Sequence, residues 1–548
     1  MSRMNQNELA KRREMERTYE TISPFEFKNK LIDLAKGHQK KSTRMMLNAG
    51  RGNPNWIAST PRDAFFSLGR FALDECRRVW DEGDLAGKPA RPGAHDRFRS
   101  FVQKHADMPG VPLLVDVVDY GIEKLGFDAD AFVHELVDGI IGDNYPEPDR
   151  MLGRVERVVH EFLMQEMCQG DASAGRFDLF AVEGATAAMC YIFDTLNENY
   201  LLTRGDRIAI MVPIFPPYVE ISQLARYDFD IVQIRASAVD AEGNHTWQYP
   251  DAELEKLADP SIKALFLVNP SNPPSVAMDE ASMRKLVELV RDKNPNLMIV
   301  SDDVYGTFVD GFRSLISVLP YNTIGVYSFS KYFGVTGWRL GVVAVHEHNV
   351  FDHLLQALPQ EKLDILDRRY ASMTLHPRDV RFLDRMVADS RQVALNHTAG
   401  LSTPQQVQMA LFAAFALLDE ENRYKQLTKD ICHRRMRLLY EGLDLPLPNI
   451  PNDADYYTEF DLEEWSNHHY GEAFTKFLQS NYEPVDILFR LAEESGIVLL
   501  NGAGFHGPTW SIRVSLANLD DQSYATIGRD LHAALEGYVN DWKSTHPQ

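Results

Sequence analysis

The chain has 548 residues, a formal net charge of −22 at pH 7, and 44% hydrophobic and 25% charged residues. This length can bury a large core and predicts at least two domains, while the acidic balance disfavours non-specific nucleic-acid binding and docking on anionic membranes. The four cysteines lack metal or redox spacing, no apolar run could span a bilayer, and the charged N-terminus shows no secretory signal, so we expect a cytoplasmic protein.

The first part of the chain has helical and loop patterns. The first forty residues are highly charged and predict a helix and an arm, and residues 47–56, with two glycines, have the pattern of a loop. Residues 62–168 are mostly helical in pattern. In Ala131–Ile141 and Arg154–Met167, for example, apolar residues recur at spacings of three and four.

From about residue 178, short β-rich runs alternate with helical patterns such as Met278–Asp292. The predicted strands are Leu179–Val182, Arg207–Val212, Ile231–Ile234, Ile262–Val268, Leu297–Ser301, Thr323–Phe329 and Gly341–Val345. Continuous apolar strands separated by helices predict a parallel sheet covered on both faces, with ligands at the carboxyl ends of its strands. Residues 350–395 are charged and helical. The tail from about 405 adds late strands at Ile497–Asn501 and Ser511–Ser515, which predicts a smaller α+β domain.

Three motifs follow predicted strands. Glu183-Gly-Ala-Thr-Ala187 opens a helix whose free backbone N–H groups could bind a phosphate, although it could also be a plain helix start. Asn269-Pro-Ser-Asn-Pro-Pro-Ser275 has the pattern of a turn, in which Asn272 could donate a hydrogen bond to a phenolate oxygen. In Ser301-Asp-Asp-Val-Tyr305, Asp302 could hold a pyridine nitrogen protonated, or could equally cap a helix.

The most informative run is Ser-Phe-Ser-Lys-Tyr-Phe-Gly-Val-Thr-Gly-Trp-Arg-Leu-Gly, from Ser328 to Gly341. Lys331 lies among small hydroxyls, and Arg339 follows eight positions later. This pattern is how a protein holds pyridoxal phosphate: the lysine bonds the aldehyde, and hydroxyls and the arginine bind the phosphate. A lone lysine is nearly always solvated surface, but this one accompanies three further motifs.

Two other patterns are set aside. Gly502-Ala-Gly-Phe-His-Gly507 fits G-x-G-x-x-G, but Pro508 and a strand follow it where a dinucleotide site needs a helix. The pairs His346 with His348 and His468 with His469 lack a third ligand in register, so we expect surface histidines and no metal.

Together the motifs, in this order from Gly184 to Arg513, resemble the fold-type I pyridoxal-phosphate enzymes of the aspartate aminotransferase family. The resemblance implies an α/β large domain with a mostly parallel seven-stranded sheet flanked by helices, and a smaller α+β domain from the N- and C-terminal parts. The expected division is an N-terminal arm over 1–60, a mainly helical inserted segment over 61–168, a cofactor-binding domain over 169–398 with an insertion at about 346–398, and a small domain over 399–548.

The resemblance also implies the site residues. Lys331 would bind the cofactor and shuttle protons, Asp302 would pair with the pyridine nitrogen, and Tyr305 with Asn272 would flank the 3′ oxygen. Arg513 would fork onto the substrate α-carboxylate, a geometry that lysine cannot copy. The remaining cofactor contacts would be Phe215 on the ring, Gly184, Ala185, Thr186, Ser328, Ser330, Arg339 and Tyr145 lent by a partner subunit, with Gly52 near the α-carboxylate.

The extra segments at about 60–140 and 346–398 resemble the L-aspartate 4-decarboxylase branch of the family. That branch implies β-decarboxylation of L-aspartate to L-alanine and carbon dioxide, with transamination using 2-oxo acids as a side activity. Arg51 would contact the distal carboxylate with Thr398 nearby, unless Arg51 is only a structural loop arginine. The resemblance further implies at least a homodimer and a larger assembly of dimers, up to a dodecamer.

Three alternatives stay open. A plain aspartate or aromatic aminotransferase would release a keto acid in place of carbon dioxide. Another pyridoxal-phosphate lyase on the same fold would release a different fragment. A non-enzymatic regulator is disfavoured, because the sequence has no helix-turn-helix pattern and no basic patch.

Overall fold

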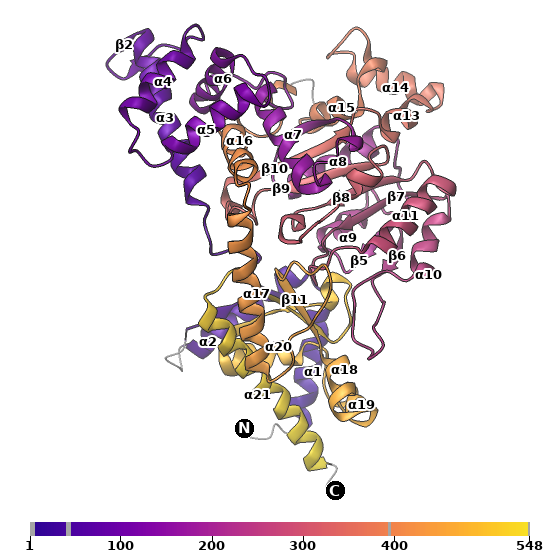
Figure 1. Cartoon of the computed structure of the whole chain (residues 1–548). Coiled ribbons are helices and arrows are strands. Elements are labelled where there is room, and N and C mark those ends of the chain that lie inside the picture. The colour runs from indigo at the N-terminus through magenta and orange to yellow at the C-terminus, as the bar shows by residue number, and fades with distance from the viewer. Residues whose placement is uncertain (1–5, 40–44, 393–395, 546–548) are drawn as a thin grey trace.

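The computed structural model describes residues 6–39, 45–392 and 396–545. Figure 1 shows a central sheet with helices, a group of helices at its upper left, and a lower part that holds both ends of the chain. In the described part of the chain, no helix has the length and apolar character needed to cross a membrane.

The central sheet has seven strands in the order β4-β10-β9-β8-β7-β5-β6. Its strands are β4 (Phe177–Glu183), β5 (Arg207–Val212), β6 (Asp230–Arg235), β7 (Ile262–Val268), β8 (Met298–Asp302), β9 (Thr323–Ser328) and β10 (Leu340–His346). β10 is antiparallel to both of its neighbours, and the other six strands run in one direction. The mostly parallel α/β fold predicted from the sequence is therefore confirmed.

The inner strands of the sheet are mostly apolar because both faces of the sheet are covered. In β7, Leu265 and Leu267 belong to a core with Leu286 of a covering helix, while Phe266 and Val268 belong to the core on the opposite face. Successive strand residues point to opposite faces, so a strand buried on both sides needs a continuous apolar run. The helices between the strands are α8 (Ala185–Glu198), α9 (Pro217–Ser222), α10 (Asp251–Leu254), α11 (Glu280–Asp292) and α12 (Leu315–Val318).

The expected helical segment before the sheet is present, and a later helix packs into it. Its elements are α3 (Ser59–Val79), a short hairpin of β2 (Asp81–Glu82) and β3 (Leu85–Ala86), α4 (Ala94–Lys104), α5 (Val111–Glu123), α6 (Ala129–Ile141) and α7 (Gly153–Cys168). α16 (Thr403–Leu418) packs against α7, α6 and α3 and shares their core (Figure 1). The domain boundaries expected from the sequence stay a prediction.

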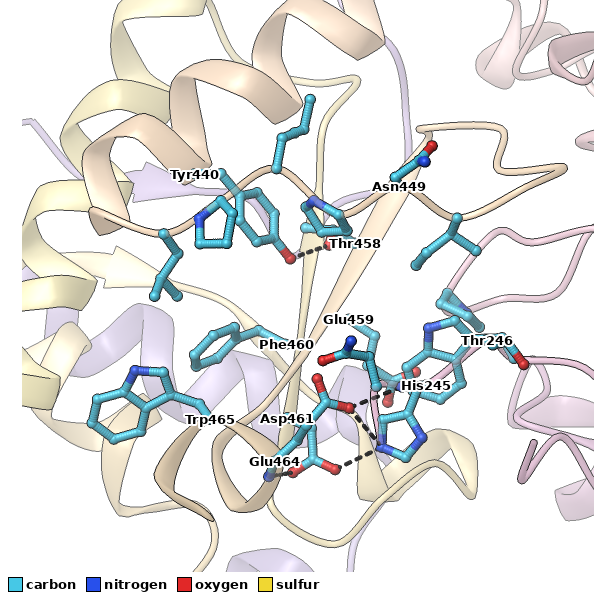
Figure 2. A pocket seen from close by; sticks show the side chains of 18 of the residues that line it. His245, Thr246, Tyr440, Asn449, Thr458, Glu459, Phe460, Asp461, Glu464 and Trp465 are labelled. Carbon is cyan, nitrogen blue, oxygen red and sulfur yellow. Dashed lines mark hydrogen bonds and ion pairs between the residues drawn. The ribbon is translucent and has the colours of Figure 1, made fainter. Parts of the chain in front are cut away.

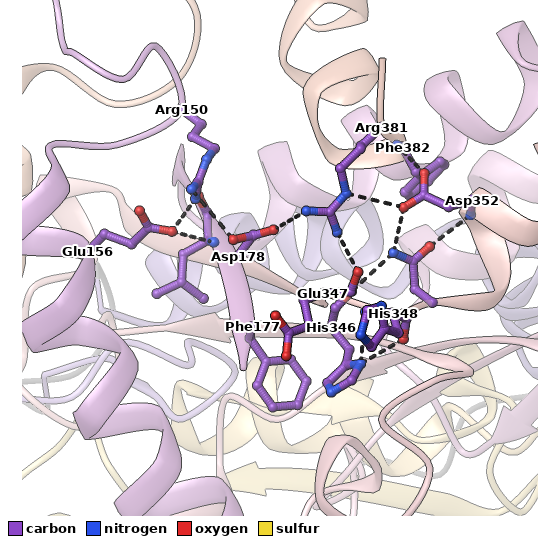
Figure 3. Close-up of polar contacts among 12 residues, drawn as sticks. Arg150, Glu156, Phe177, Asp178, His346, Glu347, His348, Asp352, Arg381 and Phe382 are labelled. Carbon is purple, nitrogen blue, oxygen red and sulfur yellow. Dashed lines mark hydrogen bonds and ion pairs between the residues drawn. The ribbon is translucent and has the colours of Figure 1, made fainter. Parts of the chain in front are cut away.

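The described part of residues 346–398 contains three α-helices: α13 (Val350–Gln356), α14 (Gln360–Tyr370) and α15 (Phe382–Asp389). A chain of charges attaches them to β4 (Figure 3). Asp178, near the start of β4, lies 3.6 Å from the Arg150 guanidinium and accepts a 2.6 Å hydrogen bond from Arg381. Arg381 also donates to the backbone oxygen of Glu347 at 2.8 Å, so one arginine ties α15 to the end of β10.

The lower part is built from both ends of the chain. Its elements are α1 (Gln6–Glu20), α2 (Pro24–Gln39), β1 (Leu47–Asn48), α17 (Arg423–Leu443), β11 (Tyr457–Asp461), α18 (Leu462–Tyr470), α19 (Glu472–Asn481), α20 (Asp486–Arg490), β12 (Ile497–Val498), β13 (Leu500–Asn501), β14 (Ser511–Ser515) and α21 (Asp521–Thr545). Phe27 and Leu31 of α2 share a core with Leu531 and Leu535 of α21.

Two details of the lower part differ from the sequence prediction. The single strand expected at Ile497–Asn501 is two strands, because β12 pairs with β1 while β13 pairs with β14. The sequence analysis also missed β11, which pairs with β14 and forms one edge of a three-stranded sheet. Its five residues, Tyr-Thr-Glu-Phe-Asp, do not alternate strictly between apolar and polar, which leaves only a weak signal for a strand.

Candidate functional site

The carboxyl ends of the parallel strands meet at a cavity of about 290 Å³. Val268 ends β7, Asp302 ends β8 and Ser328 ends β9, and all three line the cavity. The first residues of α8, which follows β4, line it from the side. Because parallel strands end at one edge of the sheet, motifs far apart in the sequence come together there. The lining residues that the sequence predicted are Gly52, Ala185, Thr186, Phe215, Asn272, Asp302, Tyr305, Ser328, Ser330, Lys331, Arg339 and Arg513.

Lys331 projects its amine into the middle of this cavity. Its Nζ donates a 2.9 Å hydrogen bond to the backbone oxygen of Gly52. Burial lowers the pKa of Lys331, and the positive charges of Arg513 and Arg339 lower it further. A lysine in this environment gives up its proton more readily than a surface lysine and so serves as a nucleophile or a base.

Asp302, and not its neighbour Asp303, faces the cavity. Its carboxylate accepts hydrogen bonds from the Tyr218 hydroxyl at 3.2 Å and from the Val304 N–H at 3.4 Å. Burial raises the pKa of Asp302 to about 6. Asp303 is instead held by the hydroxyls of two serines, Ser301 and Ser314. The buried Asp302 carboxylate is thus placed to accept a hydrogen bond from a cationic N–H, as the sequence analysis expected.

One end of the cavity is built for an anion. The N-terminus of α8 presents Ala185 and Thr186, and the hydroxyls of Ser328 and Ser330 lie 2.9 Å apart. Arg339 donates to the backbone oxygens of Thr336 and Glu183 at 2.9 and 3.3 Å. Backbone N–H groups at a helix start, hydroxyls and a guanidinium together suit a phosphate group.

Gly184 does not line the cavity, but its lack of a side chain leaves room for Arg339 at the anion-binding end. Its φ of +84° lies in the region that other residues rarely adopt. A Cβ at this position would lie 2.4 Å from the Arg339 guanidinium. Any side chain here would push Arg339 out of place, so the glycine preserves the anion-binding end.

Arg513 forms the opposite end of the cavity. It is 1% exposed, and it donates to Asn272 Oδ1 at 3.0 Å and to the backbone oxygen of Gly50 at 2.9 Å. Its Nε has no hydrogen-bond partner in the described part of the chain. A buried guanidinium with an unused N–H donor is suited to bind a carboxylate that enters the cavity.

The sequence analysis missed three residues of the site. Tyr457 lines the cavity, and its hydroxyl lies 2.9 Å from the hydroxyl of Tyr305. Tyr218 bonds Asp302, and Phe25 of α2 lies with its ring 5.7 Å from that of Phe215. Tyr218 lies three residues after Phe215, in the same short run Ile214–Tyr218, so the sequence offered a signal for it. No local pattern around Phe25 or Tyr457 predicts their place at the site.

Besides Gly184, three predicted residues do not line the cavity of a single chain. Tyr145 is 66% exposed, with its ring 4.8 Å from the ring of His397. Arg51 is exposed and next to Gly52, and its charge contributes to the lowered pKa of Lys28, after burial. Thr398 is exposed, and its backbone oxygen accepts a 2.9 Å hydrogen bond from Arg391. Their roles stay predictions.

The Gly502–Gly507 run that was set aside is not followed by a helix. The Gly502–Gly507 run contains one short 3-10 turn, Ala503–Phe505, and then leads to β14. Within the described residues, no group of three or more His, Cys, Asp or Glu side chains is arranged to hold a metal ion.

The residues present fit pyridoxal phosphate on two observations. The Gly184 cradle brings a guanidinium, hydroxyls and helix N–H groups to one end of the cavity, as a phosphate requires. Asp302 lies buried with hydrogen bonds from neutral donors, so a ring N–H would supply its missing cationic partner. Lys331, Asn272 and Phe215, three further predicted cofactor contacts, line the same cavity.

Comparisons with known proteins agree with this geometry. The family model for aminotransferase class I and II matches residues 182–527. A bifunctional aspartate aminotransferase and L-aspartate β-decarboxylase from Pseudomonas sp. is 49% identical over 530 residues, which are 96% of this chain and 98% of that protein. An aspartate aminotransferase from Pyrococcus horikoshii is 32% identical over 42% of this chain and 55% of its own.

Solved structures share the fold. A single mutant of the Thermus thermophilus aspartate aminotransferase has a TM-score of 0.57 at 14% identity, covering 92% of this chain and 95% of its own. The aspartate aminotransferase from Rhizobium meliloti has a TM-score of 0.57 at 16% identity, covering 94% of this chain and 96% of its own. At such low identity, these matches establish the fold alone.

Proposed function

This chain belongs to the class I and II aminotransferase family, and we propose that it converts L-aspartate to L-alanine and carbon dioxide and also transaminates aspartate. The observation that carries the proposal is the match to the bifunctional Pseudomonas relative over 98% of that protein. The match leaves only 4% of this chain uncovered, so it includes most of the helical segment that precedes the family model at residue 182.

The proposed cofactor is pyridoxal phosphate, held by Lys331, Asp302 and the anion-binding end of the cavity. When bound, it supplies an aldehyde that condenses with amines and a ring that withdraws electrons from bonds at the α- and β-carbons. The negative charge of Asp302 holds a proton on the ring nitrogen. The hydrogen bond from Tyr218 keeps this carboxylate oriented and favours its charged form.

Lys331 moves the proton at the substrate α-carbon. Its lowered pKa leaves a useful fraction of the amine uncharged, and an uncharged Nζ can take a proton and later return it. The Gly52 backbone oxygen, 2.9 Å away, accepts a hydrogen bond from Nζ and steers it. In decarboxylation, the β-carbon gains a proton where it loses carbon dioxide, so a proton donor close to both carbons serves the reaction.

Two arginines, Arg513 and Arg51, orient the substrate. Arg513 binds the α-carboxylate, with its position held by Asn272 and by the backbone oxygen of Gly50. Tyr457 contacts Arg513, whose guanidinium carbon lies 4.3 Å from the centre of the tyrosine ring. We assign the contact with the distal carboxylate to Arg51, with Thr398 nearby. Support for Arg51 is its place beside Gly52 at the cavity, and a loosely held carboxylate leaves more readily than a clamped one.

The proposal includes at least a homodimer, with Tyr145 lent to the site of the partner subunit, and a larger assembly of dimers, up to a dodecamer. The exposed position of Tyr145 supports an intersubunit role. Amino acids and 2-oxo acids are the proposed small-molecule partners. A cytoplasmic location is proposed because all four cysteines are unpaired, as in reducing compartments.

The test is product analysis of the purified protein with pyridoxal phosphate and L-aspartate. We expect alanine and carbon dioxide in equal amounts, and oxaloacetate as the minor product when a 2-oxo acid is added. Oxaloacetate without carbon dioxide would show a plain aminotransferase and refute the decarboxylase assignment. Lys331→Ala is expected to abolish the absorption band of the lysine-bound cofactor, and persistence of that band would refute the assignment of the site.

A further inference from the structure

A second and larger cavity, of about 780 Å³, lies beside the edge strand β11 (Figure 2). Its walls come from the loop over residues 240–247, which follows β6, and from residues 440–469, which include the end of α17, β11 and α18. It shares no lining residue with the active-site cavity. The second cavity therefore brings together segments about 200 residues apart in the sequence.

The lining of this cavity is acidic and aromatic. Its five carboxylates belong to Asp240, Asp453, Glu459, Asp461 and Glu464, and no lysine or arginine occurs among the described residues that line it. The aromatic lining residues are Trp247, Tyr440, Phe460 and Trp465. Carboxylates attract a cation, and aromatic faces bind both a cation and an apolar body.

Two of the carboxylates already contact a histidine. The Nε2 of His245 lies 3.0 Å from Asp461 and 3.5 Å from Glu464. Burial lowers the pKa of His245, but the hydrogen bond to Asp461 and the neighbouring negative charges outweigh this and raise it. The ring of His245 stacks on Trp247 at 4.5 Å, so the histidine is fixed in the wall.

Glu459 has no such partner. Its side chain lines the cavity although the residue is only 7% exposed. One carboxylate oxygen accepts a 2.7 Å hydrogen bond from the hydroxyl of Ser511, and the other has no partner in the described part of the chain. Burial raises the pKa of Glu459 to about 7. A buried carboxylate oxygen without a donor is costly, and a cationic donor in the cavity would relieve that cost.

We propose that this cavity is a second ligand site that binds an organic cation, an amine or guanidinium on an apolar body, through the carboxylate of Glu459. The cationic group reaches the unpartnered oxygen of Glu459. The apolar body lies against Trp247, Trp465 and Phe460. The buried Nδ1 of His245, which also lacks a hydrogen-bond partner in the described residues, is available to a polar atom of the ligand.

A ligand bound at this site would affect the active site through the small sheet that contains β11 and β14. Glu459 is paired directly with Arg513 in the ladder between β11 and β14, and the charge of Arg513 contributes to the pKa of Glu459. Pro274 lines the second cavity two residues after Asn272, which accepts a hydrogen bond from Arg513. A cation at Glu459 therefore changes the field at the carboxylate-binding arginine. This consequence rests on the role proposed for Arg513, whereas the binding itself does not.

The probe is n-butylguanidinium, and its neutral isostere n-butylurea is the matched control. Titrated into the cofactor-loaded protein, n-butylguanidinium is expected to bind one site per chain by calorimetry and to change the fluorescence of the lining tryptophans. We expect n-butylurea to bind at least tenfold more weakly. Equal affinity of the two compounds, or no binding of the cation at millimolar concentration, would overturn the proposal.

Variants locate the site. Glu459→Gln is expected to weaken n-butylguanidinium at least tenfold and to leave n-butylurea unchanged. Glu463→Gln, which removes a neighbouring acid of α18 that does not line the cavity, is expected to change neither affinity. If Glu459→Gln does not fold, Glu464→Gln takes its place in the test, and we expect it to weaken n-butylguanidinium binding at least threefold. A folded variant of either lining residue that binds the cation as wild type does would refute the assignment.

The coupling is tested with maleate, a dicarboxylate, whose binding is followed by the cofactor absorption. Saturating n-butylguanidinium is expected to change the maleate affinity at least twofold, and maleate must change the n-butylguanidinium affinity by the same factor. Unchanged affinities would refute the coupling. If maleate does not bind at all, the role proposed for Arg513 fails, while the fluorescence and calorimetric results still decide the second site.

Discussion

Replacement of Gly52 by alanine tests how tightly the active-site cavity is built. A Cβ on Gly52 would lie 2.3 Å from the Tyr457 hydroxyl oxygen and 3.3 Å from Lys331 Nζ, whereas ordinary contact begins at 3.4 Å. The φ of Gly52 lies outside the left-handed region, so the effect is steric and not one of backbone strain. The hydroxyl has to move by about 1.1 Å, the difference between the first and last of these distances.

This displacement has a calculable cost. Overpacking a buried site costs about 1–3 kcal/mol. The shift also breaks the buried 2.9 Å hydrogen bond between Tyr457 and Tyr305, which contributes about 1 kcal/mol. We expect Gly52→Ala to lower the free energy of unfolding by about 2–4 kcal/mol in urea. A misplacement of about 1 Å at reacting groups also predicts a loss of about 100-fold in kcat/KM.

Two further variants make the reasoning refutable. Gly337→Ala, in the lysine run, adds the same methyl group where no atom lies within 4 Å, and is expected to change neither quantity measurably. In Gly52→Ala combined with Tyr457→Phe, the clashing oxygen is absent, so at least about 1 kcal/mol of stability should return. If Gly52→Ala behaves like Gly337→Ala, or if Tyr457→Phe gives no recovery, the steric account is wrong.

Three other changes are predicted. Burial raises the pKa of Asp302 from 3.8 to about 6, so the folded cofactor-free protein binds a proton at Asp302 more tightly than the unfolded chain does. The free energy of unfolding therefore contains a contribution from this proton that is fully present below pH 4 and is lost as the pH rises through 6. At about 1.36 kcal/mol per pKa unit, the free energy of unfolding of Asp302→Asn should rise by about 3 kcal/mol relative to that of the wild type between pH 4 and pH 8. A difference that does not change with pH in urea titrations would contradict this. Tyr218→Phe removes the donor to Asp302 and should weaken pyridoxal phosphate about tenfold in absorption titrations; unchanged affinity would show that the hydrogen bond is dispensable. Asp178→Asn should lower the free energy of unfolding in urea by about 1–2 kcal/mol, because it removes the carboxylate that accepts the 2.6 Å hydrogen bond from Arg381. Glu280→Gln, in an exposed ion pair, should lower it by less than about 0.5 kcal/mol. Equal losses in the two variants would refute the idea that burial makes the first pair stronger.

Much of the fold could be predicted because its signals are local. β5 and β7 have the bounds expected from their apolar runs, and the other central strands differ by one or two residues at their ends. Alternation of such strands with helices indicates a parallel sheet, and that topology alone brings the residues after the strand ends to one edge. The convergence of Asn272, Asp302 and Lys331 was therefore predictable from the order of strands, helices and motifs along the chain.

The missed parts of the site depend on contacts between distant segments. β11 is short and lies at the edge of a small sheet, so its burial comes from α17 and from the loop at Ser275, which bonds the backbone of Tyr457. Phe25 reaches Phe215 only because α2 packs on the C-terminal part of the chain. The pattern of apolar residues in β11 and in α2 does not predict which distant segments pack against them.

Residues adjacent in the chain were enough to specify the central sheet and the order of the motifs, and to predict Lys331 as the reactive amine. Packing between distant segments selected which of two neighbouring aspartates faces the cavity, and it explains why Gly52 and Gly184 carry no side chain. Packing also placed Glu459 between Arg513 and a second cavity. These features depend on distances between segments brought together in the fold, and a linear pattern of residue types does not contain such distances.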